Sequence, residues 1–235
     1  MGGGKGRRDL SGTRLYDHII ANSLIEIPEI LAAAAETTGA VLELARGSGR
    51  LTKRAEPTGR ETVARHPSDP QPEHAFGCVI LGASYATLLD PGSRRTLFRK
   101  VNQCLAPGGR FLMTVLNPDH RHASMTTNNG ATISQLGEDS FLITVESRDA
   151  LNGARQVSTS HVSFNEHGTY RSSAYSCEVA FVSTLLIEED LAAEGFTVLD
   201  RRPIRADSQE EGIDELELWV CAARQQATAK AEERP

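Results

Sequence analysis

Hydrogen-bonding side chains follow two apolar stretches of the sequence, at points where a strand is expected to end. Ser84 and Tyr85 follow the first stretch, and Asn117 and His120 follow the second. Because the carboxyl ends of parallel strands meet at one edge of a sheet, we expect these side chains to share a pocket there. Hydroxyl, amide and imidazole groups can orient a small molecule and polarise its carbonyl. Each of them is equally compatible with a turn or a helix cap.

The sequence lacks the motifs of several other kinds of site. Its seven histidines are scattered, with no H-E-x-x-H spacing, and its four cysteines form no C-x-x-C pair. A metal site therefore has no sequence support, and buried reduced thiols are expected. No phosphate-binding G-x-x-x-x-G-K motif and no nucleophile elbow is present.

Composition excludes two classes of partner. The chain has 235 residues and a net charge of −6, whereas a nucleic-acid-binding domain normally presents a basic surface. No apolar run approaches the roughly 20 residues that span a bilayer. We therefore expect a cytoplasmic protein that binds neither nucleic acid nor membrane and acts on an apolar small molecule.

The first half of the sequence alternates strand-like and helix-like segments. This alternation predicts an α/β fold with a parallel sheet and helices on both faces. The expected helices are 15–20, 28–37 and 93–105, and the expected strands are 41–44, 62–64, 76–82 and 110–116.

The second half predicts antiparallel strands. Runs rich in Val, Thr and Tyr are separated by turn residues, which is typical of hairpins. We expect a flexible arm over 1–12, one domain over 13–224 with an antiparallel insertion at about 138–182, and a disordered tail over 225–235. The expected elements are three strands at 141–147, 156–164 and 169–182, a helix at 188–194, and final strands at 197–201 and 216–222.

Residues 41–52 (VLELARGSGRLT) resemble the first motif of class I S-adenosylmethionine-dependent methyltransferases, in which an acidic strand end precedes a glycine-rich turn. Residues 76–115, with their L-x-P-G-G-R-F segment, resemble the family's fourth and fifth strands and the intervening helix. The antiparallel insertion resembles the branch that acts on sugars, amino acids and natural products. The resemblance implies a Rossmann-like methyltransferase sheet, shortened in its first half, with a β insertion after the fifth strand.

The resemblance also implies a set of cofactor-binding positions, several of which depart from the family's pattern. Ala45 replaces the first glycine of the turn, and His66 stands where an acidic residue binds the ribose. Only residues 69–75 separate that point from the next strand, so a helix and the third strand are expected to be missing. Gly77 replaces the family's usual aspartate. The positions carried over are Glu43, Ala45, Gly47, Gly49 and His66.

Two interpretations of the cofactor site remain open. Unpaired ribose hydroxyls would cost roughly 1–3 kcal/mol if buried, and a missing adenine wall removes further buried area. Together these losses favour a chain that no longer binds a cofactor, whereas the surviving E-x-x-x-G-x-G core favours retained S-adenosylmethionine.

The substrate pocket is expected between the N-terminal helix and the insertion. By resemblance, Tyr16 belongs to a lid, and His18 lies beside it. Core packing, a turn or a solvated surface is the alternative for each candidate. The predicted substrate-binding residues are Ser84, Met113, His120, Met125, Tyr170 and Tyr175.

Three functions fit these observations. The first is a cofactor-free cyclase (a pericyclase) that folds a polyketide or polyene intermediate for cycloaddition, since holding reacting ends together lowers the barrier. Its catalytic hydrogen-bond donors would be Tyr16, His18, Tyr85 and Asn117. The second is a working S-adenosylmethionine-dependent methyltransferase, and the third is a non-catalytic partner subunit. The added sheet offers a surface for a homodimer.

Overall fold

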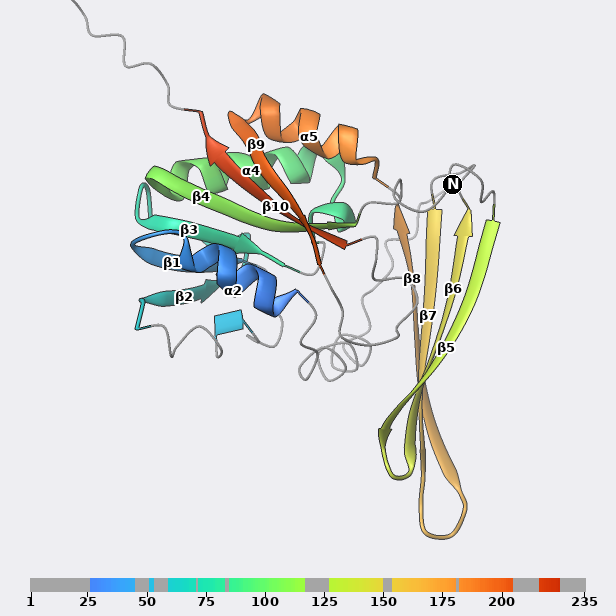
Figure 1. Ribbon diagram of the computed structural model, residues 1–235. Helices are drawn as coiled ribbons and strands as arrows, with labels where there is room; N and C mark the ends of the chain where they lie inside the picture. The colour runs from blue at the N-terminus through green and yellow to red at the C-terminus, as the bar shows by residue number, and fades with distance from the viewer. Residues whose placement is uncertain are drawn as a thin grey trace, which may run out of the picture.

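The computed structural model describes residues 26–44, 51–52, 59–70, 72–82, 85–116, 127–149, 154–180, 182–204 and 216–224. Two sheets organise these residues. A six-stranded sheet with helices on both faces carries most of the core, and a four-stranded sheet stands beside it (Figure 1).

The six-stranded sheet confirms the α/β prediction. Its strand order is β2-β1-β3-β4-β10-β9. The first four strands are parallel, and β10 runs antiparallel to both of its neighbours. The strands are β1 (Ala40–Leu44), β2 (Thr62–Arg65), β3 (Phe76–Leu81), β4 (Leu105–Leu116), β9 (Phe196–Pro203) and β10 (Leu216–Ala223).

Helices bury the two apolar faces of this sheet. Helix α2 (Ile27–Ala35) packs on the face that presents Cys78, Ile80 and Leu112. Helices α4 (Pro91–Cys104) and α5 (Thr184–Ala193) pack on the other face. Helix α5 begins four residues before the expected start at 188, because the Ser183 hydroxyl accepts a hydrogen bond from Leu185 N and caps it. No helix in the described ranges is long and apolar enough to cross a membrane.

The connection between β2 and β3 confirms the expected loss of a helix and a strand. Within the described residues, β2 pairs with β1 alone. Residues 66–70 and 72–75, which lead to β3, contain neither helix nor strand. Ten extended residues reach about 33 Å, which is enough to cross β1 and return to the start of β3. The end of this connection is fixed to α4, because His74 N and Ala75 N donate to the carbonyls of Gln103 and Cys104.

Two glycine positions have local explanations. A Cβ at Gly77 would lie 1.7 Å from the Thr38 carbonyl oxygen, so close backbone approach excludes the family's aspartate here. Residues 107–109, which precede the expected strand at 110–116, form an irregularity within β4. The pairing with β3 moves from Phe76–Leu105 to Cys78–Arg110, and Gly108 has φ +78°.

The second sheet contains four antiparallel strands rather than the expected three. The missed strand is β5, so the insertion begins at Thr127 and not near 138. Asn and Gly are common in its sequence and have low β propensity, and it is paired along its length with β6. The strands, in spatial order, are β5 (Thr127–Gly137), β6 (Ser140–Asp149), β7 (Ala154–Phe164) and β8 (Tyr170–Ala180).

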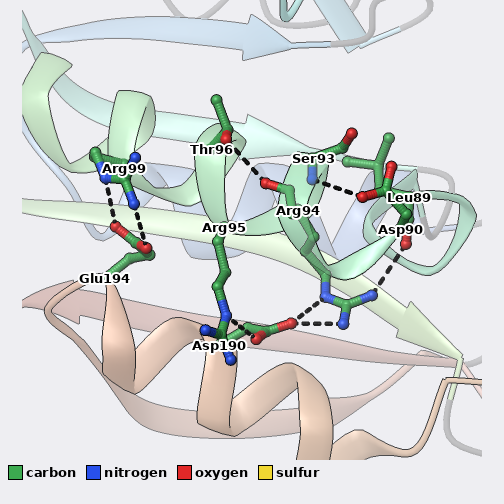
Figure 2. Close-up of polar contacts among 10 residues, drawn as sticks. Leu89, Asp90, Ser93, Arg94, Arg95, Thr96, Arg99, Asp190 and Glu194 are labelled. Atoms are coloured by element: carbon green, nitrogen blue, oxygen red, sulfur yellow. Dashed lines mark hydrogen bonds and ion pairs between the residues drawn. The ribbon is translucent and has the colours of Figure 1, made fainter.

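A buried ion-pair cluster joins α4 to α5 (Figure 2). Arg94 Nε donates to Asp190 Oδ2 at 2.7 Å, and Arg94 Nη1 donates to the Leu89 carbonyl at 3.1 Å. Arg95 Nε reaches the other Asp190 oxygen at 2.5 Å. The Arg94 and Asp190 side chains are 2% and 4% exposed, so their charges are compensated within the protein.

Candidate functional site

The carboxyl ends of β1, β2, β3 and β4 lie at one edge of the main sheet, because these strands are parallel. Ligands of open α/β sheets bind outside this edge. The side chains that end or follow these strands therefore define the candidate site.

Glu43 anchors the segment that follows β1. Its carboxylate is buried and accepts hydrogen bonds from the backbone N of Thr52, at 2.8 Å, and from the Thr52 hydroxyl. Leu51 and Thr52 are helical, and this bond gives a backbone N–H group of that segment a carboxylate partner. Glu43 thus ties the end of β1 to the residues beyond the glycine-rich segment.

Glu26 brings a second buried carboxylate to the same edge. It precedes α2 with φ +66° and is 1% exposed. A Cβ at Gly82, the residue after β3, would lie 2.9 Å from Glu26 Oε1 and 3.5 Å from a methyl of Leu51. Gly82 therefore allows this carboxylate to approach the end of β3. Glu26 was not among the residues predicted from the sequence, where its one local signal is its position just before the Ile27–Pro28 helix start.

The end of β2 presents an imidazole in place of a carboxylate. His66 is exposed, and its Nδ1 lies 2.6 Å from the Ser68 hydroxyl. The nearest carboxylate along the chain belongs to Asp69, whose Oδ2 accepts a hydrogen bond from His66 N at 3.0 Å. The turn after β2 therefore carries one acidic and one titratable basic side chain.

A cavity of about 480 Å³ lies between this turn and α4, a volume suitable for a small ligand. The short helix η2 (Tyr85–Leu88) contributes Tyr85 to its wall. Lys100 reaches from α4 toward the Pro67 carbonyl at 3.4 Å. The cavity brings together two predicted site residues, His66 and Tyr85. Its remaining polar lining comprises the hydroxyl groups of Ser68, Ser93 and Thr96, the Asp90 carboxylate and Lys100.

Several other predicted site residues lie outside the described part of the chain, and their roles remain predictions. They are Tyr16, His18, Ala45, Gly47, Gly49, Ser84, Asn117, His120 and Met125.

The remaining described substrate-binding candidates are not among the residues that line this cavity. Met113 is fully buried in the core between β4 and helices α4 and α5, so it packs as a core residue. Tyr170 is 67% exposed at the start of β8, at the end of the insertion that projects away from the main sheet (Figure 1). Tyr175 is half-buried on the same strand and, five residues on, faces the opposite side.

Comparisons with known proteins place the fold. No protein-family model and no curated protein matches the sequence. An S-adenosylmethionine-dependent methyltransferase from Clostridium acetobutylicum matches with a TM-score of 0.63 and 12% identity, covering 91% of this chain and 98% of that chain. The CcbJ methyltransferase from Streptomyces caelestis matches with a TM-score of 0.62 and 18% identity, covering 84% of this chain and 88% of that chain. CalS10, an amino pentose methyltransferase from Micromonospora echinaspora with S-adenosylmethionine bound, matches with a TM-score of 0.60 and 13% identity. The match covers 93% of this chain and 99% of that chain.

The chain has the class I methyltransferase fold. The shortened β2–β3 connection is one of the features by which this chain departs from the pattern that its sequence resembles.

The buried acidic side chains at this edge of the sheet complement the positive charge of S-adenosylmethionine. The cofactor's sulfonium and ammonium groups are cationic, and Glu26 and Glu43 place two buried carboxylates at the ends of β3 and β1. Charges attract more strongly in such a buried setting than in water. The cavity beside His66 offers space at the end of β2 for the uncharged part of the ligand.

Proposed function

We propose that this chain is an S-adenosylmethionine-dependent methyltransferase that acts on a small natural-product molecule. The observation that carries the proposal is the pair of buried carboxylates at the carboxyl edge of β1 and β3. The methyltransferase fold, matched over most of the chain by enzymes that use this cofactor, supports it. This reading takes precedence over the cofactor-free cyclase favoured by the sequence analysis.

Each part of the site has a physical role in this proposal. The bound cofactor would supply an electrophilic methyl group. Glu26 and Glu43 favour its cationic half, and the bonds from Thr52 hold the Glu43 carboxylate in place. Tyr85 and His66 line the cavity that would take the adenosyl half, where an aromatic ring can stack on a base. The helix α4 closes the far side of that cavity.

The test is calorimetric binding of the demethylated cofactor, S-adenosylhomocysteine, to the wild type and to Glu43→Gln. The amide oxygen can still accept the bond from Thr52 N, so the fold is retained while the charge is removed. Loss of a charge-assisted interaction worth about 1.5–3 kcal/mol predicts affinity weaker by roughly 10- to 100-fold. Glu166→Gln, in the exposed β7–β8 hairpin, is the matched control and is expected to bind like the wild type. A wild type that binds neither cofactor form at millimolar concentration would remove the proposal.

A cofactor-free cyclase is the second candidate, and one observation favours it. Within the described residues, the sheet ends at β2, and His66 replaces the ribose-binding acid. In this proposal the shaped cavity holds the two reacting ends together, with Tyr85 donating a hydrogen bond. Mass spectrometry separates the two functions, because a methyltransferase yields a product heavier by one methyl group and a cyclase yields an isomer of its substrate.

A further inference from the structure

The cavity beside α4 contains one acidic side chain. Among the described residues that line it, Asp90 alone carries a carboxylate, and it lines the same space as His66 and Tyr85. In the pattern that this sequence resembles, a carboxylate at the end of the second strand binds the ribose hydroxyls, and His66 stands at that position here. The cavity therefore supplies a carboxylate from the start of α4 where the strand end lacks one.

The hydrogen bonds of His66 prevent its ring from replacing the missing carboxylate. Its Nδ1 accepts a hydrogen bond from Ser68 N at 3.2 Å and lies 2.6 Å from the Ser68 hydroxyl. A neutral ring that accepts through Nδ1 carries its proton on Nε2 and donates there. The nearby Asp69 accepts from His66 N at 3.0 Å and is not among the residues that line the cavity. The hydroxyl protons of a ribose therefore need an acceptor from elsewhere.

The short connection between β2 and β3 explains why the start of α4 shares a cavity with the turn after β2. Lys100 Nζ donates to the Pro67 carbonyl at 3.4 Å, and His74 N donates to the Gln103 carbonyl at 2.9 Å. Both ends of the connection are thus attached to α4. The connection is too short for the helix and strand that the resemblance implies, so the turn and α4 face each other across the cavity.

Hydrogen bonds around the start of α4 hold Asp90 in place (Figure 2). Its Oδ1 accepts from Ser93 N at 3.0 Å, and its carbonyl accepts from Arg94 N at 2.9 Å. The Arg94 side chain donates to the Leu89 carbonyl at 3.1 Å and is itself paired with Asp190. Hydrogen bonds from the hydroxyl and the backbone of Ser93 lower the pKa of Asp90 below its usual value of 3.8, so Asp90 is ionised at neutral pH.

We propose that Asp90 binds the ribose hydroxyls of S-adenosylmethionine in this chain, in place of a carboxylate at the end of β2. This inference rests on the proposed function. An ionised carboxylate has about four acceptor sites, so it can accept from both hydroxyls of a ribose while it caps α4. The Nε2–H group of His66 can donate to a hydroxyl oxygen of the same ribose. Asp90 is exposed in the free protein, so a ligand reaches it without displacing a packed side chain.

Two ligands that differ only in their ribose hydroxyls test this role. Calorimetry measures the binding of S-adenosylhomocysteine, and of its analogue that lacks the 2′ and 3′ hydroxyls, to the full chain. The proteins are the wild type, Asp90→Ser and Asp69→Ser. Serine caps a helix about as well as aspartate, so α4 is retained, and circular dichroism checks folding. Asp69→Ser makes the same change in the acidic residue nearest to His66 and asks whether that residue binds the ribose instead.

We expect the wild type to bind S-adenosylhomocysteine about 10-fold or more tightly than the analogue, because the hydroxyls donate to a charged acceptor. Asp90→Ser should bind both ligands with the affinity that the wild type has for the analogue, whereas Asp69→Ser should keep the wild-type ratio. A ratio that Asp90→Ser leaves unchanged, or that Asp69→Ser abolishes, overturns this inference and leaves the proposed function standing. A wild type that binds neither ligand overturns both.

Discussion

The ion pair between α4 and α5 makes a quantitative prediction about stability. Asp190→Asn keeps the size of the side chain but removes the negative charge that the two arginines share. Arg94 is the important partner, because its side chain is 2% exposed and water cannot replace the lost carboxylate. The Arg95 side chain is 51% exposed, so its bond contributes at most about 1 kcal/mol.

The expected loss in the free energy of unfolding is about 3–5 kcal/mol, the cost of leaving one member of a buried pair uncompensated. At about 2–4 °C per kcal/mol for a chain of this size, the melting temperature should fall by roughly 6–20 °C. Urea denaturation at neutral pH measures the loss directly. Glu188→Gln is the control, because its bond to Arg201 joins two side chains that are 46% and 37% exposed.

A second variant distinguishes charge from packing at this position. Arg94→Met combined with Asp190→Leu removes both charges and keeps apolar volume, so it should recover most of the stability that Asp190→Asn loses. The reasoning would be refuted if Asp190→Asn lowered stability by less than about 1 kcal/mol, or if the double variant were less stable than the single one.

Two further predictions follow from local geometry and charge. Gly77→Ala should destabilise the chain by about 3 kcal/mol or more in urea denaturation, because its Cβ would lie 1.7 Å from the Thr38 carbonyl oxygen. Hydrogen bonds from Arg202 lower the pKa of Glu36 and that of Asp200 below their usual values of 4.5 and 3.8. The stability that these carboxylates contribute is therefore present above their unfolded pKa and is lost as pH falls through the folded pKa. Arg202→Gln should accordingly flatten the decline of melting temperature below about pH 4.5.

These two predictions have simple controls. Gly92→Ala should cost much less than Gly77→Ala, because its Cβ would meet a side-chain oxygen of Asp90 at 3.3 Å rather than backbone at 1.7 Å. Unchanged stability in Gly77→Ala would contradict the packing argument. For the pH prediction, the melting temperatures of Arg202→Gln and of the wild type are compared at each pH. If the two curves run parallel at every pH, the bonds from Arg202 do not shift the titration of Glu36 and Asp200.

Much of the main sheet follows from local sequence alone. Apolar runs such as 76–82 and 110–116 are long enough to be recognised as buried strands, and their order predicts a parallel sheet. The missing helix and strand follow from counting, because residues 66–75 are too few to hold them. The placement of His66 at the end of β2 follows from the strand expected at 62–64 and from the resemblance of this segment to the family's second strand.

Other features were decided only when the chain folded. Strand β5 is rich in Asn and Gly, and its pairing with β6 overrides that weak propensity. Glu26 reaches the end of β3 only through the packing of α2 on the sheet, and Arg94 meets Asp190 from 96 positions away along the chain.

The difference between the features that the sequence predicts and those that folding decides has one physical cause. Periodicity and residue counts report interactions between near neighbours, which the sequence displays directly. The buried charges and the core position of Met113 depend on which distant segments exclude water together. That exclusion is a property of the tertiary structure, since no local pattern specifies the partner that provides it.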